Sequence, residues 1–260
     1  MPIDVTQIAG LFLIVVFGVF IAVFAGGALK GHRPTLRRLE GYQMLPGQLS
    51  HAIEGGQNLH LSLGTGSIGN TDTATTLAGL SVLEFLAEEA AATETLPTVT
   101  VADPTTLILA QDTLRRAYAR QDNAAAYDPR SVRYVAASPL PYAAGTMDIL
   151  SNEETLANVM VGVFGSEAAF IAQEGSKQGL IQIAGAADIA PLAVLYPSVN
   201  HLLVGEEMFA AGGYTSEKPA HIGSLRAQDL VRWILIVVIL AVSIGALAQQ
   251  MGMLSGGLTP

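Results

Sequence analysis

The sequence contains no cysteine, and charged side chains make up only 13% of its 260 residues. Without cysteine the chain has no thiol nucleophile, no disulfide and no cysteine-metal site. Its five histidines are scattered, so none forms a metal-ligand pair at helical spacing. It has no G-x-S-x-G nucleophile elbow, and no lysine follows its one glycine loop. The sequence therefore supports neither a serine hydrolase nor a P-loop NTPase, and we assign no catalytic residue, no metal ligand and no cofactor.

Half the residues of the chain are hydrophobic, and two long apolar stretches lack charged side chains. Residues 8–29 carry no charged side chain, and residues 233–248 form the uncharged centre of the second stretch, 231–250. About 20 apolar residues are enough to cross a bilayer as a helix. A cleaved signal peptide would also explain the first stretch, but its basic residues follow the apolar run instead of preceding it. We expect two transmembrane helices in contact with the lipid bilayer.

Basic residues flank both predicted spans only on the side of the central region. The set consists of Lys30, Arg33, Arg37 and Arg38 after the first span, and Arg226 and Arg232 before the second. The positive-inside rule then predicts a cell-membrane protein with a cytoplasmic central region and both termini outside. The formal net charge is −9, and the acidic residues are concentrated between the spans. Such an acidic region is a poor nucleic-acid binder, so we expect no nucleic-acid partner.

Small residues recur at helical spacing inside both spans. Gly18, Ala22 and Gly26 share one side of the first span, and Ala241 and Gly245 are spaced likewise in the second. Small residues four apart leave a groove in which helix backbones approach closely. We therefore expect the spans to pack through these residues, either on each other or between copies in a homo-oligomer. Neither span holds an ionisable residue at its centre, which argues against an ion pathway within one chain.

The best candidate for a binding site is the glycine loop at residues 64–69. Apolar and polar residues alternate over residues 59–63 as in a strand, and the loop then spells G-x-G-x-x-G before a helix. Glycines permit tight turns and close approach of a ligand, and free amides at a helix N-terminus attract anions. The candidate ligand-binding residues here are Gly64, Thr65, Gly66, Ser67 and Gly69. A nucleotide or phosphate site and a plain strand-to-helix turn both fit this stretch.

The loop departs from the dinucleotide-binding fingerprint in two respects. An acidic residue that holds a ribose belongs about 20 residues further on, but the next acid at a strand end, Asp103, lies well beyond that distance. The helix is expected to begin only at residues 70–73. If the loop binds an anion, Gly66→Val should abolish binding and leave the domain folded, provided that Gly66 has a negative φ.

Strand and helix patterns alternate between the two spans. This alternation predicts the α/β class, a mainly parallel sheet with helices on both faces. Residues 57–217 are expected to form this domain, and residues 30–56, which contain several prolines and glycines, a juxtamembrane connector. Residues 138–150, with two prolines and a glycine, are interpreted as a loop beside the glycine loop.

Further site candidates stand where the predicted strands end. Ligands of such sheets bind beyond the carboxyl ends of the strands, which here carry Asp103, Ser166, Asp188, Glu206 and Glu207. Acidic side chains on one edge could hold magnesium. Helix capping explains the first three without a ligand, because each stands where an N-cap is expected. The pair Glu206 and Glu207 has no such explanation, so it is the pair to test first.

Three segments, HLSLGTGSIG, VGVFGSEAAFIAQEG and NHLLVGEEMFAAGGY, set between two spans, resemble a family of uncharacterised membrane proteins of bacteria and archaea, a domain of unknown function. The resemblance covers nearly the whole chain and implies no activity. Three hypotheses follow. The first is a membrane-anchored α/β domain that binds a ligand or scaffolds partners. The second is a membrane-tethered enzyme that uses a nucleotide cofactor at residues 64–69. The third is a structural organiser assembled through its transmembrane helices.

Overall fold

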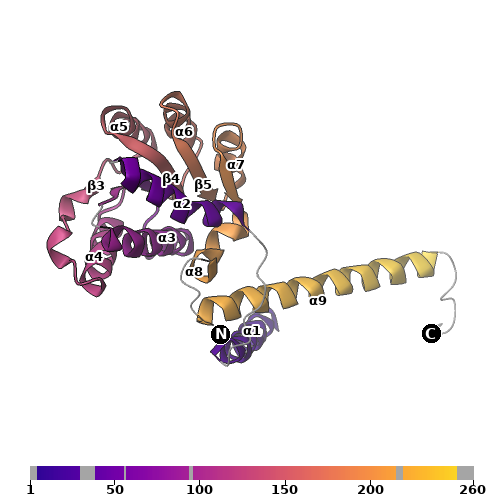
Figure 1. Ribbon diagram of the computed structural model, residues 1–260. Coiled ribbons are helices and arrows are strands. Elements are labelled where there is room, and N and C mark those ends of the chain that lie inside the picture. The colour runs from indigo at the N-terminus through magenta and orange to yellow at the C-terminus, as the bar shows by residue number, and fades with distance from the viewer. Residues whose placement is uncertain (1–4, 30–38, 56, 94–95, 215–218, 251–260) are drawn as a thin grey trace. The chain divides into compact units, whose positions relative to one another are not determined.

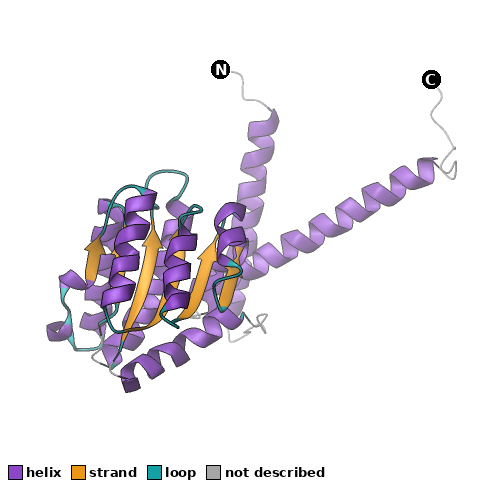
Figure 2. Ribbon diagram, turned by 90° about the horizontal axis from the view of Figure 1, so that it is seen from above, coloured by secondary structure: helices purple, strands orange, loops and turns teal. Residues whose placement is uncertain are grey.

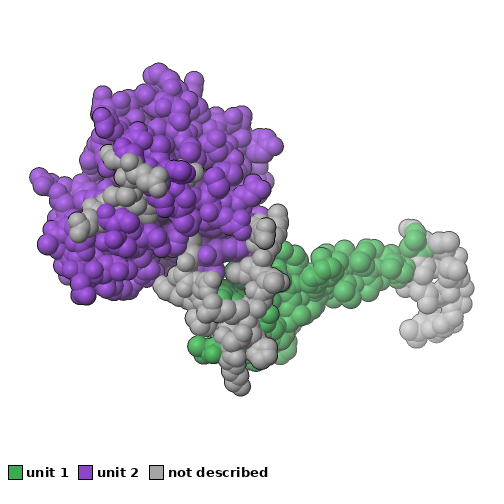
Figure 3. All heavy atoms as spheres, in the orientation of Figure 1, with its two compact units in different colours: residues 1–35, 217–260 green, residues 36–216 purple. Residues whose placement is uncertain are grey.

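The structure is a computed structural model that describes residues 5–29, 39–55, 57–93, 96–214 and 219–250. The chain divides into two compact units, shown in different colours in Figure 3. One unit comprises residues 1–35 and 217–260, and the other comprises residues 36–216.

The first unit is a pair of apolar helices, α1 (Val5–Leu29) and α9 (Pro219–Gln250). Their most apolar windows, Gly10–Gly27 and His221–Leu247, are long enough to cross a membrane. The second helix begins well before residue 231, with Pro219 at its first position, where the missing N–H of proline costs no hydrogen bond. Arg232 pairs with Asp229 one turn earlier, so this charged segment is also helical.

The two apolar helices approach each other at Gly223. A Cβ added there would lie 2.7 Å from the backbone nitrogen of Ala25 and 2.9 Å from the carbonyl oxygen of Ile21. By contrast, a Cβ on Gly18, Gly26 or Gly245 would meet no described atom within 4 Å. The prediction that the spans meet through these three glycines is therefore wrong within one chain. Packing between copies stays a prediction.

The second unit is built on a six-stranded parallel sheet with the order β3-β2-β1-β4-β5-β6 (Figures 1 and 2). Its strands are β1 (Asn58–Gly64), β2 (Thr98–Val101), β3 (Val132–Tyr134), β4 (Thr155–Val163), β5 (Ile181–Ala186) and β6 (His201–Val204). The predicted α/β fold with a parallel sheet is confirmed. The strand order reverses between β1 and β4, and ligands of doubly wound sheets bind at such a point.

Helices cover both faces of the sheet, as the prediction required. The helices α2 (Glu40–Gly55), α3 (Thr73–Ala92) and α4 (Pro104–Arg120) lie on one face, and α5 (Pro139–Asn152), α6 (Ala168–Lys177) and α7 (Ile189–Leu195) lie on the other (Figure 1). Shorter elements are η1 (Ala124–Ala126), η2 (Pro129–Ser131), η3 (Gly205–Ala210) and α8 (Ala211–Tyr214).

The central strand β1 is buried on both faces, but the two faces differ in chemistry. Leu59, Leu61 and Leu63 point toward α3. Gly79 allows α3 to lie close to the strand, because a Cβ added to this glycine would be 3.0 Å from Leu63 Cδ2. His60 and Ser62 point to the opposite face and are completely buried as well. Each buried leucine contributes about 1.5–3 kcal/mol, whereas each buried polar group needs a hydrogen-bond partner.

Residues 40–55 differ from the predicted connector, because they form α2 and belong to the α/β unit. Leu39, Tyr42 and Leu45 recur on one side of this helix and are buried. The Tyr42 hydroxyl donates a hydrogen bond of 2.8 Å to the carbonyl oxygen of Met208. The described part of the unit therefore begins at Leu39, ahead of the predicted start at residue 57.

Residues 138–150, interpreted as a loop, form most of α5. Ser138 is the N-cap and Pro139 stands in the first turn, where proline is tolerated. Gly145 lets the helix pack closely, since an added Cβ would lie 2.3 Å from Val135 Cγ1.

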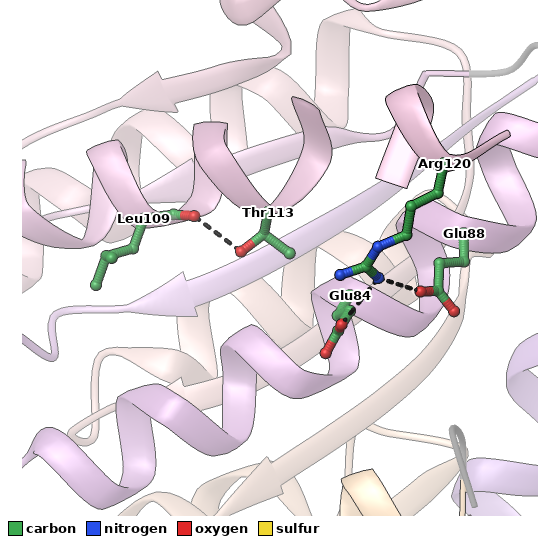
Figure 4. A network of polar contacts seen from close by, with 5 residues as sticks. All are labelled: Glu84, Glu88, Leu109, Thr113 and Arg120. Carbon is green, nitrogen blue, oxygen red and sulfur yellow. Dashed lines mark hydrogen bonds and ion pairs between the residues drawn. The ribbon is translucent and has the colours of Figure 1, made fainter. Parts of the chain in front are cut away.

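The helices α3 and α4 are joined at the surface by Arg120 (Figure 4). Its Nη1 lies 3.2 Å from Glu84 Oε1 and 2.6 Å from Glu88 Oε1. Surface ion pairs of this kind contribute about 0–1 kcal/mol each. The contact also neutralises the positive charge of Arg120, one of the few basic residues of this acidic unit.

Candidate functional site

A cavity of about 230 Å³ lies at the carboxyl edge of the sheet, next to the point where the strand order reverses. Its lining comes from the segments that follow β1, β4 and β5, and consists of Thr71, Asp72, Thr75, Gly162, Val163, Phe164, Ala186, Ala187, Asp188 and Pro191. The structure thus brings the segment after the glycine loop together with the ends of two neighbouring strands.

The glycine loop leads from β1 into α3 and is shaped by its first glycine. Gly64 has a φ of +72°, and a Cβ added there would lie 2.0 Å from the carbonyl oxygen of Val163 on β4. Thr65 continues the contact, since its amide donates to the same oxygen at 2.8 Å. The helix begins at Thr73, as predicted, so residues 65–72 form the connecting loop.

Gly66 faces the protein interior and not an open site. A Cβ there would lie 2.3 Å from Thr76 Oγ1 and 2.6 Å from Val163 Cγ2, and the carbonyl oxygen of Gly66 accepts a 2.9 Å hydrogen bond from Thr106 Oγ1. The expectation that Gly66→Val leaves a folded domain is therefore wrong, because a valine has no room. Gly69 differs, since its φ is +99° but its Cβ position is open among the described residues.

Several amides of the loop have no hydrogen-bond acceptor within the described part of the chain. They belong to Gly66, Ser67 and Ile68, and to Ala74 and Thr75 in the first turn of α3. Other amides are satisfied locally, for example Gly69 N, which donates to Thr73 Oγ1 at 2.9 Å. Unpaired N–H groups at a helix start are available to an acceptor on a ligand.

Two carboxylates line the same cavity. Asp72 and Asp188 occupy the N-cap positions of α3 and α7, yet neither side chain makes a capping hydrogen bond. Asp72 accepts instead from Thr71 Oγ1 at 3.3 Å and from Asn70 Nδ2 at 3.4 Å. Capping therefore does not explain Asp188. It does explain Asp103, whose Oδ2 accepts from the amide of Thr106 at 2.8 Å.

The charge of the cavity favours ligand groups that donate hydrogen bonds. A helix N-terminus carries about half a positive elementary charge, which two full carboxylate charges outweigh. Among the described lining residues there is no lysine, arginine or histidine. A hydroxyl or ammonium group of a ligand suits Asp72 and Asp188, and the unpaired amide of Thr75 suits a single acceptor group on the same ligand.

The remaining predicted site residues do not join this cavity. Ser166 is exposed in the turn after β4, where Glu167 and not Ser166 is the N-cap of α6. Glu207 Oε2 accepts from the amide of Val204 at 3.1 Å, so it stabilises the start of η3. Glu207 lines a separate cavity with Glu40 and His201, and its neighbour Glu206 lines neither that cavity nor the one beside the glycine loop.

Sequence reasoning missed Asp72 and the role of Asp188. Asp72 directly follows the glycine loop, and its place at the start of the predicted helix was a signal that it would reach the same edge of the sheet. Asp188 was placed at the end of a strand, but helix capping was taken to explain it. Both signals were present, but the sequence did not show that the ends of β1 and β5 converge.

A buried polar network supports the glycine loop from the face of the sheet covered by α5. The Tyr142 hydroxyl lies 2.6 Å from Ser62 Oγ and 3.0 Å from Thr100 Oγ1. It accepts a hydrogen bond of 3.3 Å from the amide of Gly64. The first residue of the loop is therefore fixed to α5 as well as to β4.

The same network continues across the sheet through His60. Its Nδ1 lies 2.8 Å from Asn158 Oδ1 and its Nε2 lies 3.1 Å from Thr100 Oγ1, while Asn158 Nδ2 donates to Gln182 Oε1 at 3.1 Å. Burial lowers the pKa of His60 to about 4, so the imidazole is neutral at pH 7. With both ring nitrogens engaged and no exposed surface, His60 is structural and not a catalytic base.

The comparisons with known proteins give one match. The family model described as a domain of unknown function (DUF6754) matches residues 2–255. No curated protein and no solved structure matches the chain.

Proposed function

The chain belongs to the family of the domain of unknown function DUF6754, and from that premise we propose that it is a membrane-anchored ligand-binding protein. Its α/β unit binds a small polar molecule in the cavity beside the glycine loop. One observation supports the proposal: Thr75, whose amide in the first turn of α3 has no described acceptor, and the uncapped carboxylates Asp72 and Asp188 line one cavity beside the switch point of the sheet.

The size and charge of the cavity indicate the ligand class. Pockets for drug-sized ligands measure roughly 300–1,000 Å³, and this cavity is smaller, at about 230 Å³. It suits a molecule of the size of a single sugar or an amino acid. Hydroxyl or ammonium groups would donate to the carboxylates, and one carbonyl or carboxylate oxygen would accept from the amide of Thr75.

A thermal-shift screen of the full chain in detergent tests this proposal. The panel contains monosaccharides, nucleosides, amino acids and nucleotides. A ligand at 100 times its dissociation constant adds about 2.7 kcal/mol to the stability of the folded state. We expect a hydroxylated or ammonium-bearing compound to raise the melting temperature of the wild type, and Asp188→Asn to remove that shift without lowering the unliganded melting temperature.

The matched control is Asp148→Asn, because Asp148 is also an exposed aspartate near one end of a helix but does not line the cavity. It should keep the full ligand shift. A shift that survives in Asp188→Asn would place the ligand elsewhere, and a panel without any shift would remove the binding proposal.

A membrane-tethered enzyme with a nucleotide cofactor is the second candidate. The strand order and the G-x-G-x-x-G motif between β1 and α3 favour it, because dinucleotide-binding domains share both. The carboxylates of the cavity oppose it, and so does the engagement of Asp103 by Thr106. Stabilisation by nucleotides alone in the same screen would support this candidate.

The third candidate is a structural organiser that forms homo-oligomers through Gly18, Ala22 and Gly26 of α1. It becomes the preferred candidate if nothing in the panel binds.

Anchoring and orientation are a separate part of the proposal. The apolar helices α1 and α9 cross the cell membrane, and the basic residues beside them keep the α/β unit in the cytoplasm with both termini outside. A reporter inserted at Gln121–Asp122 should behave as cytoplasmic. Both residues are exposed in the turn after α4, a place that tolerates insertions.

Reporters fused to the two termini should behave as extracytoplasmic. They serve as the internal comparison, since all three reporters are read in the same cells. A translocated reporter at Gln121–Asp122 would reverse the orientation and place the ligand site outside the cell.

A further inference from the structure

A second cavity, of about 410 Å³, opens at the amino edge of the sheet, where β1, β2 and β3 begin. Its lining consists of Asn58, Leu96, Thr98, Asp128, Arg130, Ser131 and Arg133. None of these residues lines the cavity beside the glycine loop, which lies at the carboxyl ends of the strands. The volume falls within the range of roughly 300–1,000 Å³ that is usual for small-molecule pockets.

Two arginines meet in this cavity, although basic residues are rare in the α/β unit. The other arginines in the described part of the unit, all on α4, are bound to carboxylates outside the cavity, such as Arg120 between Glu84 and Glu88 (Figure 4). Two residues separate Arg130, in the middle of η2, from Arg133 in β3. Both side chains therefore approach the cavity from the same short segment.

Each arginine is held in place by one carboxylate. Arg130 Nε lies 3.0 Å from Asp128 Oδ2, and Arg130 Nη2 lies 2.9 Å from the same oxygen. Arg133 Nη1 donates to Glu153, whose other oxygen accepts from Thr98 Oγ1 at 3.3 Å. A guanidinium carries five N–H donors, so each arginine retains donors on another edge. The Arg130 side chain is 90% exposed and the Arg133 side chain 41% exposed, so these donors are open to a ligand.

Ser131, between the two arginines in the sequence, also lines the cavity and carries a buried hydroxyl. Ser131 is only 7% exposed, and its Oγ has no hydrogen-bond partner among the described residues. Buried polar groups without a partner are rare and unfavourable in folded proteins. An acceptor atom placed in the cavity would satisfy this hydroxyl.

We propose that this cavity is a second ligand site, which binds the oxyanion of a small molecule, a carboxylate or a phosphate, between Arg130, Arg133 and Ser131. Planar guanidinium groups pair with both oxyanions through two parallel hydrogen bonds. Ser131 Oγ donates a further one after a small rotation of its side chain. The site is independent of the proposed function, since the cavity beside the glycine loop is lined by carboxylates and takes donor groups instead of anions.

Titration of the full chain in detergent with inorganic phosphate and with succinate tests the site, with binding measured by calorimetry. We expect one of the two to bind with a millimolar or lower dissociation constant. Arg130→Gln should weaken that binding about tenfold, as the loss of a charge-assisted hydrogen bond does. Ser131→Ala should weaken it less and leave the melting temperature unchanged or slightly raised, because its hydroxyl has no partner in the free protein.

Arg115→Gln is the matched control. Arg115 is an exposed arginine with an aspartate partner at 2.6 Å, like Arg130, but it lies on α4 outside the cavity. It should bind phosphate or succinate as the wild type does. Equal weakening of anion binding by Arg115→Gln and Arg130→Gln would show unspecific attraction and contradict the site. The proposal would also be overturned if neither anion binds the wild type at a concentration 20-fold above a millimolar dissociation constant. A preference for phosphate over succinate, or the reverse, assigns the oxyanion.

Discussion

Acidification from pH 7 to pH 5 is expected to lower the free energy of unfolding of the α/β unit by about 2 kcal/mol through His60 alone. The pKa of His60 is about 4 in the folded protein, below its ordinary value of 6.5, because burial disfavours the charged imidazole. Above pH 6.5 the histidine is neutral in both states. Between pH 6.5 and 4 the unfolded chain binds a proton that the folded chain excludes, so stability falls as the pH falls. The full loss, about 3 kcal/mol, is reached below pH 4.

Urea unfolding followed by far-ultraviolet circular dichroism between pH 7 and 5 measures this loss. Most carboxylates stay charged in that interval, so their titration contributes little. His60→Gln provides the control: it removes the titrating group and keeps an amide that donates to Asn158 or accepts from Thr100. At pH 7 this variant should have a lower free energy of unfolding than the wild type. Acidification to pH 5 should lower that free energy only slightly further. If both proteins lose the same amount, His60 is not the group responsible.

Gly64→Ala is expected to unfold the α/β unit, with a loss of about 4 kcal/mol or more. The positive φ of Gly64 costs an alanine about 1–2 kcal/mol. The larger part comes from its Cβ, which would lie 2.0 Å from the carbonyl oxygen of Val163. That oxygen belongs to the backbone of β4, so β1 and β4 would have to separate where the sheet is most deeply buried.

Gly69→Ala is the comparison, because Gly69 has a positive φ of +99° but open space around its Cβ. Its expected loss is only about 1 kcal/mol. Melting temperatures and urea midpoints of the two variants in the full chain test the pair. Equal and small losses would mean that the loop can move away from β4. That result would remove the rigid loop on which the site argument depends.

The alternation of strand and helix patterns was sufficient to predict the parallel sheet, but not the order of its strands. That order depends on β1 pairing with both β2 and β4. The pairing is decided by tertiary packing. One example is the close approach of β4 to β1 at Gly162, where an added Cβ would lie 2.0 Å from the carbonyl oxygen of Leu63. A glycine in a strand signals a close approach without naming its partner.

The two missed helices have a common cause. Both α2 and α5 contain proline and glycine, so local propensity opposed a helix. Packing prevailed in both, through Tyr42 and Leu45 in α2 and through Tyr142 in α5, which are all buried. For α5, Ser138 followed by Pro139 was a readable helix start.

The candidate site was predicted in part. The glycine loop was found from its spacing, but its second glycine turned out to serve packing and not ligand approach. Asp188 was interpreted as a cap because no sequence pattern tells whether a side chain turns back to its helix or faces a cavity. The second cavity had no signal at all, since Arg130 and Arg133 gain meaning only beside the buried Ser131 hydroxyl.

The contact at Gly223 also has a consequence in time. In the sequence the α/β unit stands between the two helices that meet there, so about 190 residues separate the end of α1 from the start of α9. At 5–20 residues per second, the ribosome needs roughly 10 to 40 s to synthesise them. For that interval α1 exists without its partner and must persist as a lone helix, which its 25 residues and uniformly apolar surface allow in a lipid environment. The contact between the helices therefore forms only after the whole α/β unit has been synthesised.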